Sequence, residues 1–208
     1  MRRVFLLALL ALALPIAAWA DIIETNQYGS ISVSNAGIFT TAGHSAQLAS
    51  WGGVSTGTSM GKVSFSTGAL TGGSLAGPTA TFAGGGSFVV VGVGAWTQTL
   101  PGSSHGPITL FTGSFVGPVV LTLTSPPGSL SLTWTLSGNL VGTLYTGRTV
   151  TGTTTQNLFS SNAQWTGGIG HISGGSGQFT VPEPGTLALL GTGLVGIAGM
   201  FRRKLIRA

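Results

Sequence analysis

Strict alternation of apolar and polar residues between positions 130 and 137 is the pattern that most limits the possible fold. Apolar residues alternate with hydroxyl residues in the order Leu130, Ser131, Leu132, Thr133, Trp134, Thr135, Leu136 and Ser137. A period of two places successive side chains on opposite faces, as in a β-strand with one buried face. We therefore expect a half-buried strand here, with Trp134 in the core.

Neighbouring segments carry the same signal. A strand at residues 119–124 precedes this one across the turn at residues 125–128, and a strand at residues 140–145 follows it across Gly138-Asn139, which predicts a three-stranded meander. Further short strands are expected at residues 31–33, 38–41, 47–51, 62–67, 79–82, 88–93, 108–111, 148–151, 163–165 and 178–181.

So many short strands predict an all-β body rich in Gly, Ser and Thr, folded as a β-sandwich or jelly roll. A β-solenoid is the alternative, because Gly-rich turns and Thr-rich strands also suit stacked coils, but no fixed repeat period is found. Glycine clusters at residues 84–86 and 174–177 are the expected flexible points, the second as a strand bulge or a loop before the last strand.

Charge is concentrated at the two ends of the chain. The whole sequence has a formal net charge of +5, but between residues 21 and 181 only Lys62 and Arg148 balance Asp21 and Glu24. Nucleic-acid binding needs clustered basic residues, so it is excluded for this body. The absence of cysteine excludes disulfides and thiol chemistry.

The first twenty residues have the order of a secretory signal peptide. Arg2 and Arg3 precede an apolar run at residues 4–14, and the small-residue ending Ala18-Trp19-Ala20 predicts cleavage before Asp21. Residues 2–6 also resemble a twin-arginine signal, although the strongly apolar run favours the general secretory route. Either route delivers residues 21–180, the body, outside the cytoplasm.

The C-terminal segment, residues 181–208, has three successive parts. Val181, Pro182, Glu183, Pro184 and Gly185 form an extended spacer with one carboxylate. The uncharged residues 186–201 would span roughly 24 Å as a helix, slightly less than a bilayer. The basic residues that follow predict a stop-transfer signal with the tail in the cytoplasm and the body outside; they are Arg202, Arg203, Lys204 and Arg207.

This order of motif, helix and basic cluster resembles the PEP-CTERM sorting domain of exopolysaccharide-producing bacteria. The resemblance implies that a membrane-embedded exosortase recognises Pro182-Glu183-Pro184, cleaves nearby and removes the tail. The implied partners are the secretion machinery, the exosortase, the inner membrane before processing, and exopolysaccharide. The implied destination is the cell surface or extracellular matrix.

Candidate catalytic groups lack their required companions. Ser59 and Ser104 both fit the G-x-S-x-G pattern of hydrolases, but the acid that such a triad needs does not follow within the body, since the next one is Glu183 in the sorting motif. Residues 191–196 match the dinucleotide fingerprint without the remainder of a βαβ unit. We therefore expect neither an enzyme nor a cofactor, with a secreted hydrolase as the least favoured alternative.

Histidines and carboxylates are too sparse to predict a metal site. His44, His105 and His171 lie about sixty residues apart without a second ligand at metal spacing, so each is expected as a solvated histidine in a turn. Asp21 and Glu24 are expected on a fraying N-terminus, where they would form neither an acid–base pair nor a calcium site.

What remains is a surface of hydroxyls, amides and aromatic rings. This favours an exported structural or adhesive protein of the cell surface or matrix, associated with exopolysaccharide or biofilm. The alternatives are a carbohydrate-binding module, which needs an exposed aromatic pair, and an ice-binding protein, which needs a flat, regular threonine array. Candidate sugar-stacking residues are Trp51, Trp96, Trp134, Tyr145 and Trp165.

Overall fold

The computed structural model describes residues 21–100, 106–125, 129, 131–160 and 167–181. Residues 21–180 form one compact unit. The expected signal helix at residues 1–20 and the transmembrane helix at residues 186–201 lie outside the described residues.

The described part of the body contains twelve β-strands and one short 3-10 helix, η2 (Ala95–Thr99). The first strands are short and the last four are long. Their bounds are β1 (Asp21–Gln27), β2 (Gly29–Ser34), β3 (Gly37–Thr40), β4 (Ala46–Trp51), β5 (Gly61–Ser66), β6 (Leu70–Gly73), β7 (Thr79–Phe82), β8 (Gly85–Gly92), β9 (Ile108–Leu123), β10 (Leu132–Leu144), β11 (Thr149–Ser160) and β12 (Gly168–Thr180).

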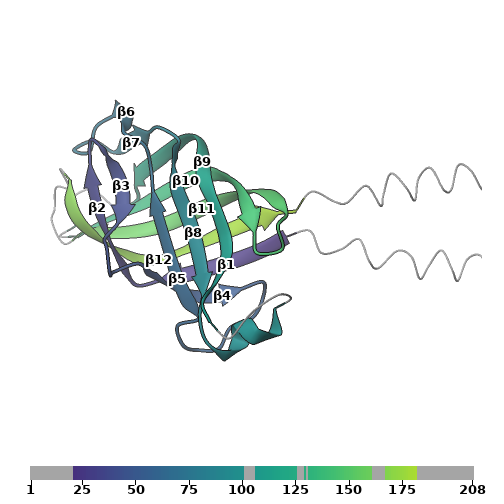
Figure 1. Ribbon diagram of the computed structural model, residues 1–208. Coiled ribbons are helices and arrows are strands. Elements are labelled where there is room, and N and C mark those ends of the chain that lie inside the picture. The colour runs from purple at the N-terminus through teal and green to yellow at the C-terminus, as the bar shows by residue number, and fades with distance from the viewer. Residues whose placement is uncertain (1–20, 101–105, 126–128, 130, 161–166, 182–208) are drawn as a thin grey trace, which may run out of the picture. The chain divides into compact units, whose positions relative to one another are not determined.

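Eight of these strands close into an antiparallel barrel in the order β1-β4-β5-β8-β9-β10-β11-β12 (Figure 1). The ring closes where β1 pairs with β12, from Asp21 opposite Thr180 to Asn26 opposite Gly175. The expected all-β class is confirmed, whereas the sandwich, jelly roll and solenoid are wrong. Pairing of the first and last strands joins the edges that an open sandwich would leave apart.

The remaining short strands extend the barrel wall. β2 and β3 continue it between β12 and β5, and β7 and β6 continue it from β9. β9 changes partner from β8 to β7 at Gly117-Pro118, where the register with β10 also shifts. Gly117 has a φ of 73°, which a glycine adopts without steric cost.

The three-stranded meander is predicted correctly at its first hairpin and incorrectly at its second. β9 and β10 pair as expected, but β10 runs without interruption through Gly138-Asn139. Gly138 serves packing there, because a Cβ atom at this position would lie 2.7 Å from the ring of Phe115. The true partner on the other side of β10 is β11, which extends to Ser160.

Most of the other expected strands are present. β1 and β6 were not expected, and the strand expected at residues 163–165 lies outside the described residues. The glycine cluster at residues 174–177 lies within β12 and pairs regularly with β11, and the bulge lies one residue before it, at Ser173, where the register between β11 and β12 shifts. In the cluster at residues 84–86, Gly84 precedes β8, while Gly85 and Gly86 are its first two residues and have a positive φ.

An aromatic cluster fills part of the barrel interior. Phe88 on β8 contacts four other rings at centroid distances of 6.1–6.5 Å; these are Phe65, Phe111, Phe115 and Phe179. Trp51 joins the cluster through Phe179, and Trp134 is buried as predicted. Aromatic pairs of this kind each stabilise a fold by about 1 kcal/mol beyond the effect of burial.

Polar side chains occupy the interior beside β12. Asn26 donates to Gln156 at 2.9 Å, Gln156 donates to Thr154 at 2.9 Å, and Thr154 donates to the Ser176 carbonyl at 3.0 Å. All three side chains are buried. Glycine at position 175 makes the room, because a Cβ there would collide with the side-chain oxygens of Gln156 and Asn26.

We expect Gly175→Ala to destabilise the barrel by about 1–3 kcal/mol, because the added methyl group overpacks the site and separates the buried amides. Urea denaturation of the exported protein measures this change. Gly174→Ala is the matched control, because a Cβ atom at position 174 would lie 3.8 Å from its nearest neighbour, the Asn26 carbonyl oxygen, and so would fit without a clash. Equal stabilities for the two variants would contradict the packing role of Gly175.

Candidate functional site

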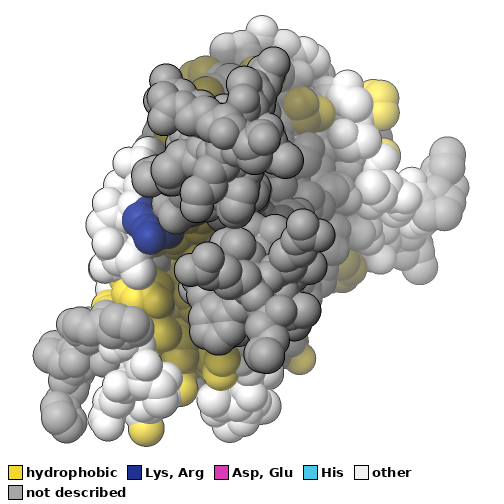
Figure 2. Space-filling view, turned by 90° about the vertical axis from the view of Figure 1, so that its right-hand side faces the viewer, with side chains coloured by type: hydrophobic (Ala, Val, Ile, Leu, Met, Phe, Trp, Pro, Cys, Tyr) yellow, Lys and Arg dark blue, Asp and Glu magenta, His cyan; other side chains and the backbone are white. Residues whose placement is uncertain are grey.

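The outward side of β10, β11 and β12 is covered by uncharged hydroxyl and amide groups. These side chains alternate with buried ones and are exposed or half-buried. We call this surface the hydroxyl face; it consists of Thr133, Thr135, Ser137, Asn139, Thr143, Thr149, Thr151, Thr153, Thr155, Asn157, Ser173, Ser176, Gln178 and Thr180. Figure 2 shows one side of the molecule, on which the described side chains are white or yellow apart from one dark blue patch.

A shallow groove of about 640 Å³ lies across the middle of the hydroxyl face. Asn139, Thr153 and Gln178 form one cross-strand row within it, on β10, β11 and β12 respectively. Val116 and Val141 supply its apolar part. Amides and hydroxyls both donate and accept hydrogen bonds, so this row can pair with sugar hydroxyls or with water.

A second hollow of about 340 Å³ lies beside the first, next to the bulge at Ser173. Gln27, Thr155 and Asn157 are among the residues that line it. The side-chain oxygen of Asn26, beneath this hollow, is buried and has no hydrogen-bond partner among the described atoms. The hollow therefore offers further neutral hydrogen-bonding groups.

The aromatic residues singled out in the sequence do not form an exposed pair among the described residues. Trp51 and Trp134 are buried in the barrel. Trp96 is half-buried in η2, where its indole donates to the Met60 carbonyl at 2.9 Å, and Tyr145 is also half-buried. Trp165 lies outside the described residues. The large exposed rings are instead Tyr28, Phe39 and Phe159.

Two of the three histidines meet in one surface pocket, which the sequence did not indicate. His44 lies in the loop between β3 and β4 and is exposed, as expected. His171 is also exposed but lies within β12 rather than in a turn, because β12 extends back to Gly168 along β2. His105 lies outside the described residues. Only the pairing of β2 with β12 brings positions 44 and 171 together.

The described residues do not form a metal-binding cluster. Within these ranges, clusters of three or more His, Asp or Glu side chains are absent. The hydroxyl of Ser59 is exposed and donates to the Gly61 carbonyl at 3.1 Å, and Ser104 lies outside the described residues.

Glu24 is buried in the barrel interior, and the expectation of a fraying N-terminal pair is wrong for it. β1 is paired on both sides, with β4 and β12, so its inward residues lie in the core. The Glu24 side chain is fully buried, and neither carboxyl oxygen has a hydrogen-bond partner at normal geometry. Burial raises the pKa of Glu24 to about 8, and the backbone of Gly177 opposes this only in part. The carboxyl group is therefore protonated at neutral pH.

The raised pKa predicts that stability falls as the pH increases. Between pH 4.5 and 8 the folded state holds a proton on Glu24 that the unfolded state has released. In this pH range the free energy of unfolding should fall by up to about 1.4 kcal/mol per pH unit. Below pH 4.5 the carboxyl group is protonated in both states, so Glu24 does not lower the free energy of unfolding there. Glu24→Gln should remove most of this slope in urea denaturation series from pH 4.5 to 8.5.

Gln27→Glu is the matched control for this experiment, because it places a carboxyl group on an exposed position of the same strand. It should leave the slope of the parent protein unchanged. A slope that persists in Glu24→Gln would show that Glu24 is not its source and would contradict the raised pKa of this group.

Residues 182–208 of the expected sorting segment lie outside the described residues, as do Ala18 and Ala20 of the signal peptide. Asp21 is the first residue of β1, and Val181 directly follows β12. Within the described ranges, no helix is long and apolar enough to cross a membrane.

Comparison with known proteins identifies the C-terminal segment. The family model of the PEP-CTERM protein-sorting motif matches residues 180–204, which include Val181, Pro182, Glu183 and Pro184. No curated protein and no solved structure matches the chain. The chain therefore carries a PEP-CTERM sorting motif, which indicates an exported protein that is targeted to an exosortase.

Proposed function

We propose that this protein is a structural or adhesive component of the cell surface or extracellular matrix, where its barrel associates with exopolysaccharide. The observation that carries the proposal is the hydroxyl face, with its row of Asn139, Thr153 and Gln178 in an open groove. A hydrated neutral polymer presents hydroxyl groups that such a surface can bind directly or through water.

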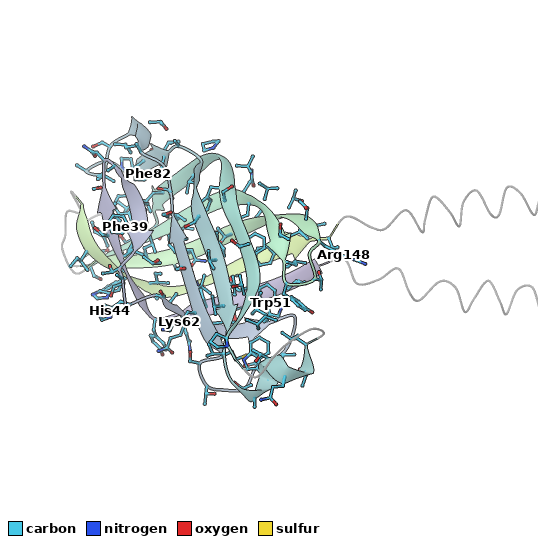
Figure 3. All side chains as sticks on the ribbon, in the orientation of Figure 1. Phe39, His44, Trp51, Lys62, Phe82 and Arg148 are labelled. Carbon is cyan, nitrogen blue, oxygen red and sulfur yellow. The ribbon has the colours of Figure 1, made fainter. Side chains whose placement is uncertain are left out.

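The charge of the body supports a neutral partner. Lys62 and Arg148 are exposed, while Glu24 is buried and protonated at neutral pH. Lys62 lies on β5 and Arg148 in the turn between β10 and β11, so the two cations do not share a strand (Figure 3). Binding to this surface should consequently depend weakly on salt concentration.

The construction of the barrel supports a scaffold role rather than catalysis. The interior of the described barrel is filled by aromatic rings and by the hydrogen-bonded side chains of Asn26, Thr154 and Gln156. Grooves on the outside are shallow and lined by uncharged groups. We therefore propose a protein without enzymatic activity, which acts by binding.

Ice binding is the second candidate, because four exposed threonines alternate along β11: Thr149, Thr151, Thr153 and Thr155. The neighbouring strands continue this array only in part, with Thr143 on β10 opposite Thr149 and Thr180 on β12 opposite Thr151. Ser137 and Asn139 oppose two of these threonines on β10, and Ser176 and Gln178 oppose them on β12. A mixed and curved surface favours hydrated sugar over a flat ice lattice.

Processing by an exosortase predicts that Glu183→Ala accumulates as a full-length, membrane-bound precursor. The substitution leaves the apolar run at residues 186–201 and the basic cluster unchanged, so anchoring in the bilayer should persist while recognition is lost. The parent protein should lose a C-terminal fragment of about 25 residues. Mass spectrometry of the cell-surface form decides this, and a parent protein that retains Arg202 through Ala208 would refute processing.

Association with exopolysaccharide predicts that alanine at Asn139, Thr153 and Gln178 together weakens binding about tenfold, because several exposed hydrogen bonds are lost. Co-sedimentation of the exported protein with exopolysaccharide from the same culture measures this. Thr71→Ala and Thr79→Ala, at exposed positions on β6 and β7, are the control substitutions. Undiminished binding by the triple variant would exclude the groove as the contact surface.

A further inference from the structure

A polar pocket of about 450 Å³ lies where β1 passes into β2, away from the groove of the hydroxyl face. Tyr28 connects the two strands, His44 and Ser45 come from the loop between β3 and β4, and His171 comes from β12. Figure 3 shows His44 and Phe39 towards the same end of the barrel. The volume is within the range of roughly 300–1,000 Å³ that is usual for small-molecule sites.

Backbone hydrogen bonds hold the parts of this pocket in place. The Ser30 N–H donates to the His44 carbonyl at 2.9 Å, and the Gln47 N–H donates to the Tyr28 carbonyl at 3.1 Å. Ser30 is also the cross-strand partner of His171, and its hydroxyl lies 3.5 Å from the imidazole Nδ1. These contacts place the backbones of His44 and His171 next to Ser30.

Tyr28 has an unusual conformation for its residue type. Its φ is 50°, and it is the one non-glycine residue with a positive φ in the described part of the chain. This left-handed conformation is unfavourable for a bulky residue and is more often found at functional sites. The ring is 64 % exposed, so it contributes little to the core. A glycine would make the same bend without strain, so the retained ring points to a contact outside the protein.

We propose that this pocket binds one neutral sugar unit of a polysaccharide, with the sugar ring stacked on Tyr28. The imidazoles of His44 and His171 and the amide of Gln47 would hydrogen-bond the sugar hydroxyls. Lys, Arg, Asp and Glu are not among the described residues that line the pocket, which favours a neutral sugar over a uronic acid or a sulfated sugar. The inference rests on the proposed association with exopolysaccharide and assigns it a defined sugar site.

The surface beside the pocket offers a second contact along the same chain of sugars. Phe159 on β11 is exposed and is the cross-strand partner of His171. Ile169 on β12 and Phe39 on β3 are exposed on the same wall, each paired with Ser32 on β2. Apolar groups beside hydroxyls suit the mixed faces of a sugar ring, so the polymer would extend from Tyr28 across these strands.

Neutral oligosaccharides released from the exopolysaccharide of the same culture test this site on the exported protein. Titration followed by NMR should shift the imidazole resonances of His44 and His171 more than that of His105. Tyr28→Phe should bind like the parent protein, whereas Tyr28→Gly should bind at least tenfold more weakly without any fall in melting temperature, because glycine accepts a positive φ. His171→Ala should weaken binding severalfold, and Thr71→Ala at an exposed position on β6 should not.

The outcomes separate this inference from the proposed function. If the parent protein binds the oligosaccharides and Tyr28→Gly binds equally well, the pocket assignment is wrong while the polysaccharide association stands. If the protein co-sediments with whole exopolysaccharide but no oligosaccharide shifts the histidine resonances, the defined sugar site is likewise rejected. Loss of binding on addition of EDTA would assign the two histidines to a metal ion and overturn the proposal.

Discussion

Pairing between the first and last strands of the body determines the rest of this structure. β1 and β12 meet in register from Asp21 opposite Thr180 to Asn26 opposite Gly175, and this contact converts a long antiparallel sheet into a closed ring. Closure satisfies the backbone groups that the two edges would otherwise expose. The body can therefore hold its fold outside the cytoplasm without any cysteine in its sequence.

Closure also determines which residues need to be small. Large inward side chains from β1 and β11 require glycines opposite them on β12, so Gly175 faces Asn26 and Gln156, and Gly177 faces Glu24. The same relation holds between Gly138 on β10 and Phe115 on β9. Glycine in this chain is therefore as much a packing residue of the barrel wall as a turn residue, which explains its frequency within long strands.

Local alternation predicted the strands well, because the period of two reflects burial on one face at each position. β7 (Thr79–Phe82) matches its predicted bounds, and Trp134 is buried as its phase indicated. The closure between residues 21 and 180 could not be predicted in this way, because strands so far apart leave no local pattern. For this reason, sequence analysis places Glu24 on a free end, whereas it lies in a strand paired on both sides. Gly138-Asn139 is typical of a turn in the sequence, but in the structure Gly138 lies within β10 and makes room for Phe115.

The candidate site shows the same division between local and long-range information. Uncharged hydroxyls and amides were evident in the composition, and the hydroxyl face follows from their alternation along β10 to β12. The pocket at Tyr28 depends on the pairing of Ser30 with His171 and on a positive φ, neither of which has a sequence signature. An exposed tyrosine before Gly29 was the available signal, and it is too common to identify a site.

The position of the closing strands has a consequence for processing. β1 begins at Asp21, the residue before which signal cleavage is expected, and β12 ends at Thr180, the residue at which the match to the sorting motif begins. Cleavage before Asp21 and after Val181 would therefore leave every strand of the barrel intact. The hydrogen bonds that close the ring lie between the two signals rather than within either of them. Removal of residues 1–20 and of the residues after Val181 would consequently leave the barrel closed, so that such processing would require no refolding of the body.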